Sequence, residues 1–216
     1  MQNRFTLSEQ ALEYMPILER TNKIETWFNS DEEFNRLYPV EMQLLAHKHW
    51  TPLNIAKKAA NFLAAEPHKK ILDIGSGVGK FCLSAAYYKP NSFYYGVEQR
   101  ENLIAFSEAA KNSLEIVNVS FIYGNFTQLN LSKFDHFYFY NSFYENLIDT
   151  AKIDDSIAYS GELYNYYNGY LFKQLEQLPR GTRLATFHGL LGNEIPTCFH
   201  IVGSEMDNLL QYWVKV

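Results

Sequence analysis

The chain has 216 residues, of which 47% are hydrophobic and 20% are charged, and a formal net charge of −5. These values are typical of a globular protein with a substantial core. Lys and Arg do not cluster beyond pairs, so the composition predicts that nucleic acid is an unlikely partner. The start lacks an apolar leader and no run approaches the ~20 apolar residues of a membrane span, so we expect a cytoplasmic protein without membrane contact. Cys82 and Cys198 are too few for a disulfide framework or a zinc cluster.

The first part of the chain is predicted to be a helical extension, residues 1–65, ahead of one α/β domain at 66–216. Its expected helices cover 7–20, where Pro16 must kink or end the helix, then 31–37, 39–48 and about 51–65. Pro52 falls in the first turn of the last of these helices. Together with a Tyr-rich stretch at 159–170, the extension is expected to cover a ligand pocket that suits a small molecule or a protein side chain.

From residue 70 onward, strands and helices alternate with the short connections of a parallel sheet. The expected strands are 70–74, 93–97, 118–123, 135–140 and 182–187, and the expected helices are 79–88, 100–113, 143–150 and 160–178. Two more strand-like runs, 197–203 and 208–215, are joined by a polar link at 204–207. They predict an antiparallel hairpin at one edge of the sheet.

A glycine-rich turn follows the first of these strands. Residues 71–83 read ILDIGSGVGKFCL, a hydrophobic strand that breaks into alternate glycines and then into a helix. Gly75, Gly77 and Gly79 lack a Cβ, so the backbone there tolerates positive φ and approaches a ligand closely. The spacing departs from the dinucleotide pattern G-x-G-x-x-G, since Lys80 stands where the last glycine belongs, and no P-loop Gly-Lys-Ser/Thr follows. A turn with no ligand is the alternative.

This segment resembles motif I of the class I S-adenosylmethionine-dependent methyltransferases, D/E-x-G-x-G-x-G. The resemblance implies a Rossmann-like seven-stranded sheet of five parallel strands plus a C-terminal antiparallel hairpin. It implies S-adenosyl-L-methionine as the cofactor. It also implies that the following residues bind the cofactor: Asp73, Gly75, Ser76, Gly77 and Gly79.

Residues after the second and third strands extend the resemblance. Glu98, followed by Gln99, stands where this class places a carboxylate that accepts hydrogen bonds from both ribose hydroxyls. Asn125 stands where the family usually has an Asp that contacts the adenine amino group, and Phe126 could lie against the adenine ring. The alternatives are an exposed charge at Glu98 and an ordinary turn at 124–125.

The fourth strand ends in Asn141, Ser142, Phe143 and Tyr144, where the sequence loosely resembles amino-group methyltransferases, including the non-SET histone-lysine type. A nitrogen nucleophile must be held in line with the sulfonium methyl while its hydrogens are accepted. Asn141, which also belongs to the expected cofactor set, and the Ser142 carbonyl would accept them. Phe143 and Tyr144 would line the substrate slot. Both prolines of the N-P-P-Y/F pattern are absent, and a plain helix N-cap at Asn141 or Ser142 is the alternative.

Two further residues are candidates by position. Thr51, before Pro52, resembles a Thr-Pro that contacts the methionine carboxylate of the cofactor in adenine amino-methyltransferases, although capping alone explains it equally. His188 follows the fifth strand and is the best-placed titratable base, with a structural histidine as the alternative. His47 and His49 have no carboxylate at metal-ligand spacing, so no metal is expected.

Three functions are therefore open. The leading hypothesis is a methyltransferase that acts on an unidentified acceptor, such as an amine of a small molecule or a protein. A non-catalytic S-adenosylmethionine-binding or partner-binding protein of the same fold is the second, because the prolines around Ser142 and Phe143 are missing. An NAD(P)-linked oxidoreductase is the third, and the glycine spacing argues against it.

Overall fold

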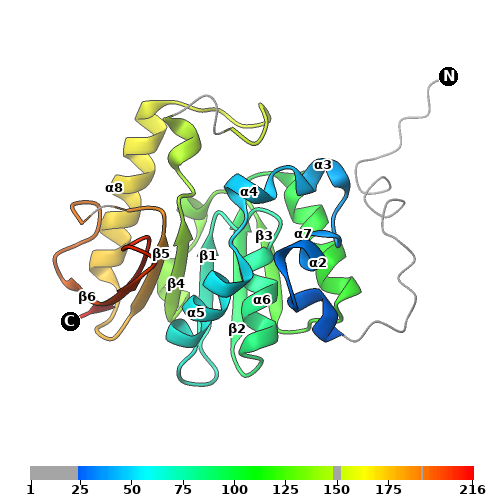
Figure 1. Cartoon of the computed structure of the whole chain (residues 1–216). Helices are drawn as coiled ribbons and strands as arrows, with labels where there is room; N and C mark the ends of the chain where they lie inside the picture. The colour runs from blue at the N-terminus through cyan, green and yellow to red at the C-terminus, as the bar shows by residue number, and fades with distance from the viewer. Residues whose placement is uncertain (1–23, 148–151, 191) are drawn as a thin grey trace.

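The computed structural model describes residues 24–147, 152–190 and 192–216, and the helix expected at 7–20 lies outside them. A seven-stranded sheet of order β3-β2-β1-β4-β5-β7-β6 forms the centre of the molecule (Figure 1). The strands are β1 Lys70–Ile74, β2 Phe93–Glu98, β3 Val119–Tyr123, β4 His136–Tyr140, β5 Arg183–Phe187, β6 Phe199–Glu205 and β7 Leu210–Lys215.

The pairing of the strands confirms the predicted fold class. β1 to β5 pair in parallel, β7 is antiparallel to β5, and β6 is antiparallel to β7. The order of strands reverses at β1, which has β2 on one side and β4 on the other. In an open α/β sheet, such a switch point leaves a crevice beyond the carboxyl ends of the strands, where ligands bind.

Helices cover both faces of the sheet, and the alternation of strand side chains divides the core between them. Ile71 and Tyr94 share a core with α5, α6 and α7, whereas Leu72 and Ile74 share a core with α8 and the turns η2 and η3. Both faces of β1, β2, β4 and β5 are thereby largely buried, as their nearly continuous apolar sequences predict, whereas β3 at the edge is partly exposed. The bounds are α5 Leu53–Leu63, α6 Lys80–Tyr88, α7 Glu101–Ser113, α8 Gly161–Gln177, η2 Phe126–Gln128 and η3 Leu131–Lys133.

Short helical segments precede α5 and pack on α6. They are η1 Ile24–Phe28, α2 Asp31–Asn35, α3 Val40–Gln43 and α4 Ala46–His49. Phe28 stacks on Tyr87 of α6 with ring centroids 4.0 Å apart. The buried Lys80 ammonium lies 2.6 Å from the carboxylate of Asp31, and the Tyr38 hydroxyl donates to the Val78 carbonyl at 2.9 Å. These contacts fix η1, α2 and Tyr38 against α6 and the glycine turn.

Several boundaries differ from the expectation. The helix expected at 39–48 is two separate turns, α3 and α4. The helix expected at 143–150 is a 3₁₀ turn, η4 Tyr144–Asn146, and residues 148–151 lie outside the described part. β6 extends to Glu205, into the expected link at 204–207, so that the turn lies at 206–209, where Met206, Asp207 and Asn208 have positive φ.

The start of α5 also differs. Pro52 is its N-cap residue, and the Thr51 side chain does not cap the helix. Instead, the carboxylate of Asp31 accepts the Leu53 amide at 3.0 Å. Because Asp31 also pairs with Lys80, one carboxylate joins α2, α5 and the end of the glycine turn.

Candidate active site

A cavity of about 410 Å³ lies at the carboxyl ends of the central strands. Its walls come from the glycine turn after β1, the residues that follow β2, β3, β4 and β5, the α4 turn, Tyr167 of α8, and part of the segment 153–159. The position agrees with the switch point of the sheet, and the size is in the range of small-molecule sites. This cavity is therefore the candidate site.

The glycine turn forms one wall through its backbone. Gly75, Gly77 and Gly79 have φ of 77°, 54° and 82°, in the left-handed region that favours glycine. Gly75 and Gly77 line the cavity, whereas Gly79 begins α6 and lies under the ring of Phe121. At Gly77 a side chain would meet nothing within 4 Å, so this part of the wall is open to a ligand.

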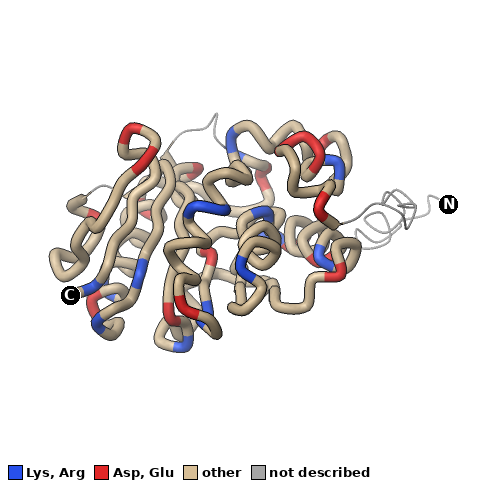
Figure 2. Tube along the Cα trace, turned by 60° about the horizontal axis from the view of Figure 1, so that its bottom comes forward, with Lys and Arg blue, Asp and Glu red and all other residues tan. Residues whose placement is uncertain are grey.

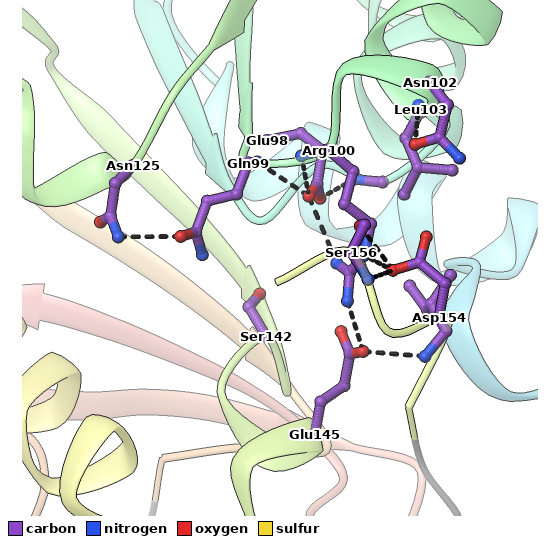
Figure 3. Close-up of polar contacts among 12 residues, drawn as sticks. Glu98, Gln99, Arg100, Asn102, Leu103, Asn125, Ser142, Glu145, Asp154 and Ser156 are labelled. Atoms are coloured by element: carbon purple, nitrogen blue, oxygen red, sulfur yellow. Dashed lines mark hydrogen bonds and ion pairs between the residues drawn. The ribbon is translucent and has the colours of Figure 1, made fainter. Parts of the chain in front are cut away.

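Glu98 ends β2 on the wall next to the glycines. Its carboxylate accepts the Gly77 amide at 3.1 Å. It also accepts the Gln99 amide at 2.8 Å and the Arg100 amide at 3.0 Å (Figure 3). Burial raises the pKa of Glu98 above its usual value, while Arg100 and the amide donors lower it. The carboxylate is thus held in one orientation, with one edge on the cavity.

Residues after β3 supply an aromatic wall. Phe126 lines the cavity and stacks on Phe143 with centroids 5.2 Å apart. Asn125 does not line the cavity: its Nδ2 donates to Gln99 at 2.9 Å and to the Tyr167 hydroxyl at 2.9 Å, while its Oδ1 accepts the Thr127 amide. Gln99, also an expected cofactor residue, does line the cavity.

Asn141 and Ser142 follow β4 and line the cavity. Asn141 has φ of +46°, which turns the chain sharply at the end of the strand. The Ser142 hydroxyl donates to the Ile74 carbonyl, which ties the end of β4 to the end of β1. Asn141 does not cap η4, whose N-cap residue is Phe143, so the expected alternative of a simple helix cap does not hold.

The other three acceptor candidates also line the cavity, in different ways. Phe143 is buried and packs edge-on against Phe139 at 4.9 Å, so it forms the floor. Tyr144 is 38% exposed at the opening. His188 is exposed, has φ of +47°, and contacts the ring of Phe187 at 4.4 Å.

Three predicted cofactor residues lie behind this wall. Thr51, Asp73 and Ser76 line an adjoining space of about 10 Å³, the size of one water molecule. The Thr51 hydroxyl lies 3.1 Å from that of Tyr138, and the buried Ser76 hydroxyl finds no partner among the described residues. The structure does not place these three on the main cavity.

Asp73 is fully buried at the end of β1. Burial raises the pKa of its carboxyl to about 8, a shift that the Cys82 thiol, 3.8 Å away, reduces and that the charge of Glu98 increases. A carboxyl with this pKa carries a proton at neutral pH in much of the ligand-free protein.

Sequence reasoning missed several cavity residues. Arg100, Glu145 and Tyr159 contact one another on one wall, and the rings of His49 and Tyr140 lie on another. Burial lowers the pKa of His49, and the charge of Glu145 opposes this. Arg100 could have been suspected because it follows a strand end directly after Glu98. Tyr159 begins the Tyr-rich stretch that was expected to cover the pocket. The other three carry no local pattern, since only the fold brings α4, β4 and Glu145 together.

The family comparison agrees with this geometry. Residues 65–167, just under half of the chain, match the family model described as a methyltransferase domain. They include the glycine turn, Glu98 and Asn141. Residues 65–167 are a class I S-adenosylmethionine-dependent methyltransferase domain. The cofactor and fold predicted from the sequence are thereby confirmed, whereas the N-directed detail at Asn141–Tyr144 stays a prediction.

A curated relative of this methyltransferase domain is a tRNA (guanine-N(7)-)-methyltransferase of Nostoc sp. It is 33% identical over 82 residues, which cover 38% of this chain and 36% of the relative. A tRNA (guanine-N(7)-)-methyltransferase of Prochlorococcus marinus is 36% identical over 75 residues, or 34% of each chain. The chain thus spans about a third of the length of these relatives.

Solved structures share the fold. TrmN from Thermus thermophilus has a TM-score of 0.55 at 18% identity, over 80% of this chain and 51% of that one. An RNA methyltransferase from Salinibacter ruber, solved in complex with S-adenosyl-L-homocysteine, has a TM-score of 0.52 at 17% identity, over 76% of this chain and 92% of that one. At such identities the likeness shows the fold alone.

The expectation that nucleic acid is an unlikely partner is wrong, because the curated relatives of the domain are named for tRNA. It rested on the charge of the whole chain. Figure 2 shows Lys and Arg interspersed with Asp and Glu over the fold, so the net charge of the chain does not describe the charge of any one surface. At the cavity, the exposed His47 and Lys48 line the wall, while Glu98 and Glu145 are paired with Arg100. Among the described helices, none is long and apolar enough to cross a membrane.

Proposed function

We propose that the protein transfers the methyl group of S-adenosylmethionine to a nitrogen atom of its acceptor. The observation that carries the proposal is the cavity of about 410 Å³, which brings the glycine turn, Glu98 and Asn141 onto one set of walls. The cofactor supplies an electrophilic methyl on its sulfonium, so the protein has to position the acceptor and exclude water.

The proposed cofactor position follows from the walls. The Glu98 carboxylate would accept the ribose hydroxyls, and Phe126 would lie against the adenine. The open backbone at Gly77 would face the methionine part. Asp73, Thr51 and Ser76, in the small space behind, would support that end of the ligand rather than enclose it. The unpartnered Ser76 hydroxyl supports a polar group or a water there, because a buried hydroxyl without a partner is unfavourable.

Asn141 is proposed to orient the acceptor. Its side-chain oxygen and the Ser142 carbonyl would accept the hydrogens of an amino group, or Asn141 would donate to a neighbouring acceptor atom of a ring. Either contact directs the nitrogen lone pair toward the methyl carbon. The positive φ of Asn141 supports this role, since strained residues gather at functional sites.

A base in RNA is the acceptor class that we favour. The rings of His49, Tyr140, Tyr144 and His188 line the cavity and suit a planar heterocycle, which protein rings recognise by stacking. The curated relatives, named for N7 of guanine in tRNA, support the same class. An amine of a small molecule or of a protein is the other nitrogen acceptor to be tested.

Labelled methyl transfer tests the proposal. The protein is incubated with S-adenosylmethionine carrying a tritiated methyl group and with total tRNA, a protein extract or a filtered small-molecule extract. We expect label in RNA that ribonuclease removes, and a loss of ~100-fold in Asn141→Ala, as for loss of one positioned hydrogen-bonding group. Asn112→Ala, exposed on α7, is the matched control. Label only in a protein or small-molecule fraction would replace RNA by that acceptor.

Calorimetry with S-adenosylhomocysteine separates the remaining alternatives. Binding without transfer to any fraction would favour a non-catalytic S-adenosylmethionine-binding protein. That alternative was suggested by Ser142 and Phe143, which stand in place of two prolines. No binding at millimolar concentration would overturn the proposed function altogether.

A further inference from the structure

One stretch of chain, distant in sequence from the glycine turn, forms part of the same cavity wall. We call residues 152–159 the strap; it leads into α8, whose N-cap is Ser160 (Figure 1). Ile153, Ile157, Ala158 and Tyr159 of the strap line the cavity. Any ligand that fills the cavity therefore touches the strap.

Arg100 holds the strap in place (Figure 3). Its Nε donates to the Asp154 carboxylate at 3.1 Å, and its Nη2 donates to the Tyr159 hydroxyl at 2.6 Å. The same Nη2 donates to the Glu145 carboxylate at 2.7 Å, which in turn accepts the Ile153 amide at 2.9 Å. The planar guanidinium can serve these partners at once because its five donors point in fixed, different directions.

The same guanidinium reaches the wall under the proposed ribose. Arg100 Nη1 lies 3.4 Å from Glu98 Oε1, and the side chain of Arg100 is only 3% exposed. Burial acts to lower the pKa of Arg100, but the charges of Glu145 and Glu98 raise it, so the side chain stays a cation. A buried cation between carboxylates from separate segments links those segments, since removing it leaves buried charges unpaired.

We propose that Arg100 is a positioning residue that fixes Glu98 for the cofactor ribose and holds the strap over the bound cofactor. This inference rests on the proposed function. Arg100 does not touch the reacting atoms. Its two roles are coupled through one side chain, so loosening the strap also loosens Glu98, and cofactor release requires the Asp154 and Tyr159 contacts to part.

The variants Arg100→Lys, Glu145→Gln and Tyr159→Phe test the proposal, in order of decreasing expected effect. Lys keeps the charge but offers a compact ammonium that cannot reach all of these partners. We expect at least ~10-fold faster dissociation of S-adenosylhomocysteine in Arg100→Lys and a smaller increase in the other two. We expect KM for S-adenosylmethionine to rise while kcat changes little. Arg36→Lys, which alters an exposed ion pair with Glu33 on α2, is the matched control.

Hydrogen exchange of the ligand-free protein supplies a readout that does not depend on the cofactor. We expect faster exchange at the strap amides in all three test variants and no change in β1 or in the control. Wild-type protein that fails to bind S-adenosylhomocysteine would overturn the proposed function. Wild-type protein that binds it, with folded variants that show the same dissociation rate and the same strap exchange, would overturn the role of Arg100.

Discussion

The turn after β1 and the turns after β4 and β5 lie at the same edge of the sheet and all contain left-handed backbone, but at different residue types. After β1, every position with left-handed backbone is a glycine: Gly75, Gly77 and Gly79. After β4 and β5, the left-handed positions are Asn141, His188 and Leu190, with φ of 46°, 47° and 55°. Glycine adopts this conformation freely, whereas a side chain there costs on the order of 1 kcal/mol.

The difference indicates that the turn after β1 lines the cavity with backbone, whereas the turns after β4 and β5 line it with side chains. At the glycine turn, a side chain would fill the ligand wall or strike a neighbour. At the turns after β4 and β5, a strained backbone conformation persists although glycine would remove the strain. Asn141 and His188, which bear this strain, both line the cavity. Strain that is kept beside a cavity supports a functional role for the side chains that bear it. The wall proposed for the cofactor thus lacks side chains at its left-handed positions, and the wall proposed for the acceptor keeps them.

The largest expected effect, on stability, distinguishes Gly75, where a side chain would clash, from Gly77, where it would only be strained. A Cβ at Gly75 would lie 2.5 Å from Ser142 Cβ, whereas one at Gly77 would meet nothing within 4 Å. We expect Gly75→Ala to lower the free energy of unfolding by ~3 kcal/mol or more, from overpacking plus strain, and Gly77→Ala by ~1 kcal/mol from strain alone. Urea unfolding measures both.

A double variant supplies the control for this pair. Ser142→Gly removes the atoms that the new Cβ would strike, so Gly75→Ala in that background should recover part of the lost stability. Equal losses for Gly75→Ala and Gly77→Ala, or no recovery in the double variant, would show that contact with the β4 turn does not decide the glycine at 75.

A smaller effect concerns the buried carboxyl beneath the glycine turn. The folded-state pKa of Asp73 is about 8, above its ordinary 3.8 in an unfolded chain, so the folded state binds the extra proton in between. The stability that this proton contributes is fully present below about pH 4 and is lost as pH rises through about 8. Between about pH 6 and about pH 7.5, wild-type protein should lose ~2 kcal/mol relative to Asp73→Asn.

Denaturant unfolding of the ligand-free protein at several pH values checks this, with Asp135→Asn as the control at the opposite, amino end of β4. The Asp135 carboxylate accepts the Lys70 amide at 2.7 Å, and its residue is not buried. Parallel pH profiles for wild-type protein and Asp73→Asn would mean that Asp73 is ionised in the folded state throughout.

The sequence predicted the fold more fully than the site. The five parallel strands and the hairpin were predictable because their apolar runs and turns are local signals, and β1 is found at 70–74 as expected. The helix expected at 39–48 was wrong, because Pro39 only starts α3, which ends at Gln43, and the chain begins a separate helical turn at Ala46. The glycine turn and Glu98 could be placed because strand ends in such a sheet share one edge.

The remaining site residues depend on contacts between distant segments. Arg100 meets Asp154 and Tyr159 across more than fifty residues of sequence, and no spacing rule connects them. Asn125 was expected at the ligand, but its amide is used by Gln99 and Tyr167, which the sequence could not foresee. Positive φ at a non-glycine residue is likewise not predictable from the sequence, because even Asn and His, which adopt it more often than other residues, do so at only a small share of positions.

The smallest expected effect tests whether the retained side chains after β5 serve function rather than stability. His188→Gly removes the strain of φ +47°, and the ring is exposed, so we expect the free energy of unfolding to rise by ~0.5–1 kcal/mol. His200→Gly, at an exposed position in β6, should lower it by a similar amount because glycine weakens a strand. If His188 contacts the acceptor, methyl transfer falls only in the first variant, and the more stable protein is the less active one. A loss of stability in both variants, with transfer unchanged, would mean that the acceptor side is held by ordinary packing and that its strain has no functional counterpart.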